Sequence, residues 1–126
     1  MYLRFVTKGI DEDSLQPKGV LVASYELLES GELTQEEWSR VRSILDWFND
    51  NLPHPPKDLN LSRAIYWFKM GAKEYISRVW ELVHVLQEHG HFVDVQRRPT
   101  LASIVYEDKY QVAAFVSRLD GKLNVR

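Results

Sequence analysis

Three closely spaced prolines constrain this sequence more than any other feature. Pro53, Pro55 and Pro56 lie in the stretch Asn49 to Ser62, which also contains three asparagines. Proline lacks a backbone N–H and interrupts helices and central strands, so we predict that this stretch is a loop. The loop separates a helical first half from a mixed second half. Each half is too small for a core of its own, which predicts one domain that spans both.

The chain has 126 residues, of which 44% are hydrophobic, 27% are charged and none is cysteine. This composition is typical of a globular domain. The absence of cysteine excludes a disulfide scaffold, a zinc finger, an iron–sulfur site and a thiol nucleophile. The formal net charge of −2 disfavours a nucleic-acid partner, because such proteins normally carry a basic excess. No apolar run approaches the ~20 residues of a membrane span and the N-terminus lacks a signal-peptide core, so we expect a soluble cytoplasmic protein without a membrane partner.

The first half is predicted to contain a strand and two helices. Residues 1–7 are rich in aromatic and β-branched side chains, as strands are, and residues 10–18 are predicted to be a loop. Residues 19–30 have a broad apolar face and are followed by Gly31, a common residue just after a helix. Thr34 and Glu37 fit a capping box, which predicts the start of the next helix. The apolar stripe of that helix recurs at steps of three and four residues and comprises Trp38, Val41, Leu45, Phe48 and Leu52.

The second half is predicted to alternate strands with one helix. Residues 63–70 suit a strand, residues 71–88 a helix, and residues 91–96, 102–106 and 110–116 three more strands. Residues 64–95 suit one strand–helix–strand crossover with parallel strands, and the last two strands suit an antiparallel hairpin. The predicted fold class is α+β, with a mixed sheet of about five strands and three helices in the order βααβαβββ over residues 1–116. Residues 117–126 are predicted to form a flexible tail.

The strand at residues 63–70 is apolar on both faces. Ile65 and Trp67 point to one face, while Tyr66 and Phe68 point to the other. A sheet with helices on one side only normally has a polar second face, so something is expected to cover the second face here. Either a helix of the same chain covers it, or a second copy of the protein or a ligand does.

Trp47 lies away from the apolar stripe of its helix, and tryptophan is a favoured anchor at protein interfaces. It is expected either to cover the proline loop or to contact a partner. The leading hypothesis is therefore a non-enzymatic protein-interaction module that acts as a homodimer or binds another protein. The residues expected at the interface are Trp47, Ile65, Trp67, Tyr110 and Phe115.

An alternative hypothesis is the binding of a small anionic molecule beside the aromatic strand Ala64–Lys69. Cationic side chains next to aromatic rings can hold an anion against an apolar surface. The residues expected to line this pocket are Arg63, Tyr66, Lys69 and Trp80.

No pattern in the sequence supports a catalytic, metal or cofactor site. Glu81 and His84 form one Glu-x-x-His pair, whereas the di-iron sites with this motif need two pairs and further carboxylates. Glu107 and Asp108 lie at the tip of the predicted hairpin, where carboxylates are normally solvated. The sequence has neither a glycine-rich phosphate loop nor a Gly-x-Ser-x-Gly motif. His89 lies at the end of a predicted helix, where a cation is favourable.

The sequence resembles a set of small bacterial proteins of unknown function from Met1 to about Phe115. The segments that carry the resemblance are Met1 to Val6, Leu45 to Pro53, Ala64 to Lys69, Glu88 to Gly90 and Ile104 to Ala114. The resemblance implies a bacterial, cytoplasmic origin. It implies no activity, cofactor or catalytic residue.

Overall fold

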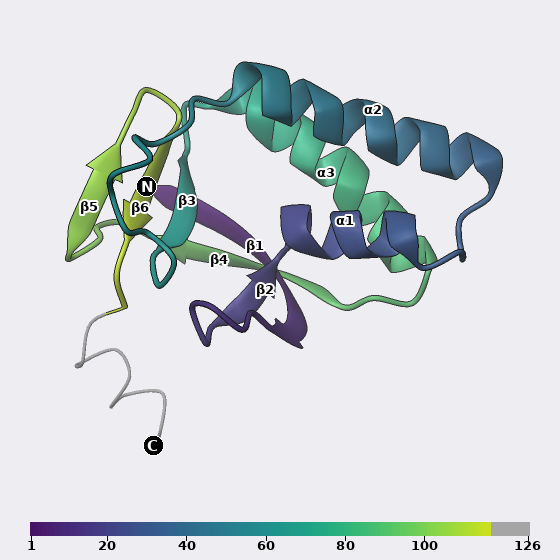
Figure 1. Cartoon of the computed structure of the whole chain (residues 1–126), viewed down its shortest axis with the longest axis horizontal. Helices are drawn as coiled ribbons and strands as arrows, with labels where there is room; N and C mark the ends of the chain where they lie inside the picture. Colours follow the sequence, from purple (N-terminus) through teal and green to yellow (C-terminus); the bar gives the residue numbers. More distant parts are fainter. Residues whose placement is uncertain (117–126) are drawn as a thin grey trace.

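Strand β1 (Tyr2–Ile10) is the central strand of the fold, because it pairs with three other strands. The computed structural model describes residues 1–116, in which three helices pack on one six-stranded sheet (Figure 1). The helices are α1 (Val20–Glu29), α2 (Gln35–Asn51) and α3 (Lys73–Glu88). The other strands are β2 (Pro17–Gly19), β3 (Ile65–Lys69), β4 (Val93–Arg98), β5 (Ile104–Glu107) and β6 (Gln111–Ala114). The predicted tail, residues 117–126, lies outside the described residues.

Two strands share one edge of β1. β4 pairs with β1 from Tyr2 to Thr7 and occupies the opposite edge. β3 pairs at the beginning of β1, at Tyr2 and Leu3, whereas β2 pairs further along, at Val6 and Ile10. The order across the sheet is therefore β4–β1–β3–β6–β5, with β2 beside the second half of β1. Among residues 1–116, no strand pairs with this edge of β1 between β2 and β3.

The α+β class is confirmed, but two details of the predicted sheet are wrong. Every paired neighbour is antiparallel, so the sheet is not mixed. β3 and β4 do run in the same direction, since both are antiparallel to β1, but β1 lies between them. The sheet also gains β2 within the region predicted to be a loop. A three-residue strand that begins with proline has no alternating pattern, and proline is tolerated there because the strand is short and starts with it.

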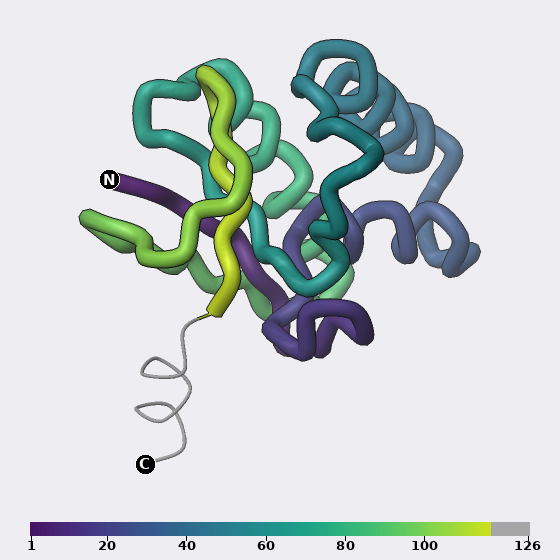
Figure 2. Tube along the Cα trace, turned by 60° about the vertical axis from the view of Figure 1, so that its left-hand side comes forward, coloured from purple at the N-terminus to yellow at the C-terminus, as the bar shows by residue number. Residues whose placement is uncertain are grey.

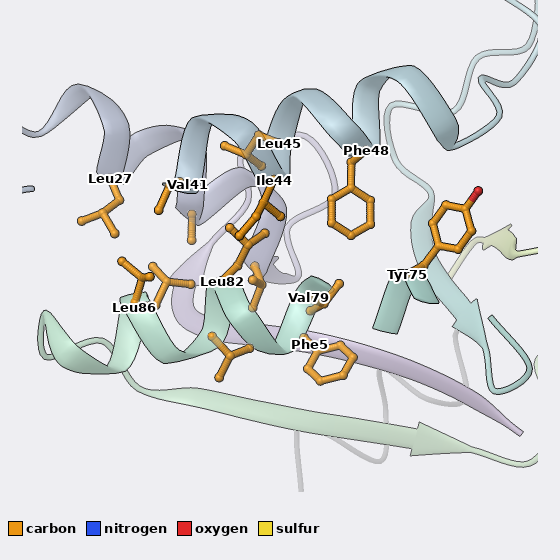
Figure 3. Close-up of a cluster of buried hydrophobic side chains, with 14 of the residues drawn as sticks. Phe5, Leu27, Val41, Ile44, Leu45, Phe48, Tyr75, Val79, Leu82 and Leu86 are labelled. Carbon is orange, nitrogen blue, oxygen red and sulfur yellow. The ribbon is translucent and has the colours of Figure 1, made fainter. Parts of the chain in front are cut away.

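The helices lie on the same side of β1 and β4 (Figures 1 and 3). Leu3 and Phe5 of β1 point toward them and belong to the main core. Arg4 lies between these two residues in an extended strand and therefore points to the second face. Of the two coverings that the sequence left open, a helix on the second face is thus absent from the part of the chain that the structure describes.

The main core lies between the three helices and the sheet. Figure 3 shows α2 and α3 contributing facing rows of aliphatic side chains, with Phe5 reaching up from the sheet. Leu82 and Leu86 of α3 are fully buried, as is nearly all of Val41 and Leu45 of α2. The stripe predicted for α2 is wrong at Trp38, which is 44% exposed and donates its indole N–H to the carbonyl of Leu28.

The predicted glycine after α1 and the predicted capping box of α2 are both present, and a second glycine follows α3. Gly31 and Gly90, just past α1 and α3, adopt φ angles of +78° and +82°, a region that favours glycine. The Thr34 hydroxyl accepts from the backbone N–H of Glu37, and a Glu37 oxygen accepts from the Thr34 N–H, which completes the capping box. The second Glu37 oxygen lies 2.9 Å from Nε2 of His89, so the start of α2 is tied to the end of α3.

This tie predicts an acid-sensitive contribution to stability. The hydrogen bond from the Thr34 backbone, followed by that from His89, lowers the pKa of Glu37 below its usual value. A carboxylate with a lowered folded-state pKa stabilises the fold above its unfolded-state pKa of about 4.3, and that stabilisation is lost as pH falls through the folded-state value. Glu37→Gln should therefore lower the free energy of unfolding in urea at pH 7, and by less at pH 3. Glu36→Gln, an exposed neighbour, is the control. An equal loss at both pH values would show that the charge of Glu37 does not contribute to stability.

The core predicts a large cost for removing one leucine. Leu82 has no exposed surface, so Leu82→Ala leaves a cavity among the helices and should lower the free energy of unfolding by about 2–5 kcal/mol. Leu59→Ala makes the same chemical change at a side chain that is 41% exposed, and it should cost less than about 1 kcal/mol. Similar losses in the two variants would show that α3 is not the centre of the core.

Candidate functional site

A cavity of about 480 Å³ lies where β2 and β3 separate along the shared edge of β1. This volume is within the range of small-molecule sites. Its lining includes Arg4 and Phe5, the two residues of β1 between the partners of β3 and β2. Trp67 of β3 and Gly19 of β2 line it from either side. The cavity therefore occupies the unpaired gap in the sheet.

The connection between α2 and β3 borders this cavity. Figure 2 shows the chain running from the end of α2 down to the β1–β2 hairpin before it turns into β3. The linking residues 52–64, which we call the connecting segment, include the three prolines and contribute seven lining residues: Leu52, Pro53, His54, Pro55, Leu61, Ser62 and Ala64. The predicted proline loop thus helps to form the candidate site.

A chain of hydrogen bonds holds the connecting segment to the sheet. Gln111 of β6 is 4% exposed, and its side-chain amide donates to the carbonyl of Pro53 at 2.9 Å and to Asp108 at 3.1 Å. Asp108 also accepts from the Tyr106 hydroxyl at 2.7 Å and from the backbone N–H of Tyr110 at 2.8 Å. Burial raises the pKa of Asp108, but these hydrogen bonds outweigh it and leave the pKa below its usual value.

Arg4 is the buried charge of the cavity. Only 8% of the surface of this residue is exposed, and its guanidinium donates to the carbonyl of Pro17 at 2.6 Å. Within residues 1–116, Arg4 forms no ion pair with a carboxylate. Burial lowers the pKa of Arg4 to about 10, with a smaller opposing effect from the charge of Asp11. The side chain is therefore cationic at neutral pH and lies in a mostly apolar cavity without a bonded anion.

The N-terminus of α1 adds a second positive feature to the same cavity. Gly19, Val20, Leu21 and Val22 all line it. No side chain of residues 1–116 caps this helix, and its first turn carries no acidic residue. The first backbone N–H groups of a helix have no partner within the helix and carry a partial positive charge, which favours an anion.

Trp67 supplies an unpartnered donor. Leu3 and Phe68 are paired across β1 and β3, so the next residues along, Arg4 and Trp67, share the opposite face. Trp67 is 4% exposed, and its indole N–H has no hydrogen-bond partner among the described residues. A buried donor without a partner costs about 1–3 kcal/mol, so this indole N–H lowers the stability of the fold.

The five predicted interface residues do not lie together as one group. The ring of Tyr75 packs against Trp47 at 4.9 Å and against Tyr110 at 4.4 Å between centroids. The Arg78 guanidinium lies 4.0 Å from the centroid of the Trp47 ring, so Trp47 packs against two residues of α3. By contrast, Ile65 and Trp67 line the cavity. Phe115 follows β6 and is 39% exposed. Self-association through these residues stays a prediction.

Of the four residues predicted for an anion pocket, only Tyr66 lines the cavity. Lys69 pairs with Glu107 at 2.6 Å, and Arg63 is exposed. Trp80 lies on α3, where its ring packs edge-on against Phe5. The prediction missed Arg4, although a signal was present, because a single arginine among the apolar residues of an N-terminal strand is unusual.

Glu107 and Asp108, the acidic pair at the tip of the predicted hairpin, have structural roles. Asp108 organises the turn between β5 and β6, and Glu107 pairs with Lys69. In residues 1–116, no group of three or more histidine or acidic side chains is placed to hold a metal ion. Nor does any helix in that range have the length and apolar character needed to cross a membrane.

Comparison with known proteins gives no family for this chain. No protein-family model matches it, and neither the curated proteins nor the solved structures contain a match. The function of the cavity is therefore inferred from its own geometry.

The hydrogen bonds of Gln111 predict how the connecting segment is held. Gln111→Met removes both donors and leaves the Pro53 carbonyl without its partner. Amide hydrogens in residues 52–61 should then exchange faster with deuterium, while those of α3 should change little. Gln96→Met, on the far side of β1, is the control and should leave the segment unchanged. Unchanged exchange in the Gln111 variant would show that the segment is held by other contacts.

Proposed function

We propose that this chain is a small-molecule-binding domain whose cavity takes a ligand with an anionic group and an apolar body. The observation that carries the proposal is the placement of Arg4, a buried guanidinium without an anionic partner in the described residues, in the lining of a cavity of about 480 Å³. Removing a cation from water costs several kcal/mol unless an anion or several acceptors replace the water. The Arg4 guanidinium has five N–H donors, and the carbonyl of Pro17 accepts from only one of its nitrogens.

A further feature supports an anion in the same place. The N-terminus of α1 lines the cavity, and no side chain of residues 1–116 caps it. Like the Arg4 guanidinium, the free N–H groups at a helix N-terminus favour an acceptor that carries negative charge. The rest of the lining is largely apolar, with Phe5, Ile65 and Tyr66 among its members. Binding sites for small molecules commonly combine such walls with a few polar groups that fix orientation.

Thermal unfolding with a panel of aromatic and aliphatic carboxylates and phosphates tests the proposal, with the matching uncharged amides and alcohols as controls. A ligand that binds only the folded state raises Tm, and at 100 times its Kd it adds about 2.7 kcal/mol to the free energy of unfolding. We expect at least one anion to raise Tm by several degrees and its uncharged counterpart to have no effect. A panel in which no anion raises Tm would overturn the proposal.

Arg4→Met isolates the role of the cation. The variant keeps an unbranched apolar side chain and removes a buried charge, so it should remain folded by circular dichroism. The Tm shift caused by the anion should disappear in this variant and persist in Arg97→Met, which changes an exposed arginine of β4. Arg4→Lys keeps the charge and should retain part of the shift. A shift of wild-type size in folded Arg4→Met would contradict the proposed site.

A further inference from the structure

The carboxylates at the cavity identify a narrower class of ligand. Asp11 and Asp13 line the same cavity as Arg4. The lining therefore carries one arginine and two aspartates, in addition to His54, and it is not a strongly cationic site. A phosphate ester with two negative charges would gain from Arg4 but would be repelled by both carboxylates. A ligand with one negative and one positive charge would complement both signs.

Asp11 lines the same cavity as Arg4 but is not paired with it. The charge of Asp11 raises the pKa of the Arg4 guanidinium against the effect of burial. Among residues 1–116 the two side chains form no ion pair. Each charge therefore retains capacity for another partner within one cavity. The ammonium and carboxylate of an α-amino acid offer one opposite charge to each of them.

The Asp11 carboxylate is held in position before any ligand binds. Its Oδ1 accepts from the backbone N–H groups of Asp13 at 2.8 Å and Ser14 at 3.1 Å. The backbone of Asp11 is also bonded at both ends, because its N–H donates to Gln16 and its carbonyl accepts from Leu15. Its Oδ2 forms no hydrogen bond among residues 1–116 and can accept from an ammonium group. This preorganisation reduces the entropy lost on binding.

We propose that the ligand is a small zwitterion of the α-amino-acid type with an apolar side chain, an inference that rests on the proposed function. Its carboxylate would lie at Arg4 and the N-terminus of α1, and its ammonium group at Asp11. Its side chain would lie against the apolar walls, which include Ile65 and Tyr66. No covalent step is involved. The structure thus supplies one group for each part of such a molecule.

Calorimetric titration of three matched probes tests this assignment. L-phenylalanine carries both charges, 3-phenylpropionate lacks the ammonium group, and 2-phenylethylamine lacks the carboxylate. We expect L-phenylalanine to bind at least tenfold more tightly than either of the others, which corresponds to about 1.4 kcal/mol. L-leucine and 4-methylpentanoate form a second pair with an aliphatic side chain, in case the walls favour that shape.

The variants assign the preference to one carboxylate. Asp11→Asn keeps an Oδ1 acceptor for the two turn N–H groups and removes only the charge. It should reduce the preference for L-phenylalanine over 3-phenylpropionate to less than threefold. Glu12→Gln removes a neighbouring charge outside the cavity lining and should keep the wild-type preference.

The possible outcomes separate the two proposals. If the amino acids and their deamino analogues bind wild type equally well, the zwitterion assignment is wrong and the anion site stands. An undiminished preference in folded Asp11→Asn would also overturn the assignment. If none of the probes binds at concentrations up to ~10 mM, the assignment fails. Their Kd values would then exceed 1 mM, the value that corresponds to a binding free energy of about −4.1 kcal/mol. The anion panel with Arg4→Met then decides the proposed function by itself.

Discussion

The pairing of β1 with three strands is the constraint on which the rest of the structure depends. β4 lies on one side of it, and β3 leads on the other side to β6 and β5. The hydrogen-bonded ladder between these two parts of the sheet passes through β1. The same strand supplies Leu3 and Phe5 to the core beneath the helices and Arg4 to the opposite face. Its position therefore determines both where the helices dock and where the cavity opens.

The parts of the fold that could be predicted from sequence are those set by short-range chemistry. The capping box of α2 needs only Thr34 and Glu37, and the ends of α1 and α3 need only Gly31 and Gly90. The hairpin of β5 and β6 likewise follows from a turn between two apolar runs. The insertion of β1 between β3 and β4 has no such local signal. It depends on contacts between residues about 65 to 95 positions apart, and the sequence around each strand gives no indication of its neighbour.

The same distinction explains the outcome for the candidate site. The predicted anion pocket lies between the strand at residues 63–70 and the helix that follows it, but Lys69 pairs with Glu107 and Trp80 packs against Phe5, so these residues do not meet in one cavity. Arg4 reaches the cavity from a segment about 60 residues earlier, so proximity along the chain did not indicate it. At Trp38 and Trp47, the apolar stripe predicted for α2 differs from the surface that the helix buries. α2 packs on two helices rather than flat on the sheet, and its buried surface extends around to Trp47.

The position of Arg4 also has a consequence for the fidelity of folding. In a strand, successive side chains alternate between the two faces, so a slip of β1 by one residue would exchange all of them. Arg4 would then turn toward the helices, into a core made of leucine, valine and aromatic side chains. Leu3 and Phe5 would lose their places in that core. A charged residue at this point makes the misaligned sheet far less stable than the native one, so the group proposed to recognise a ligand also protects the chain against misfolding.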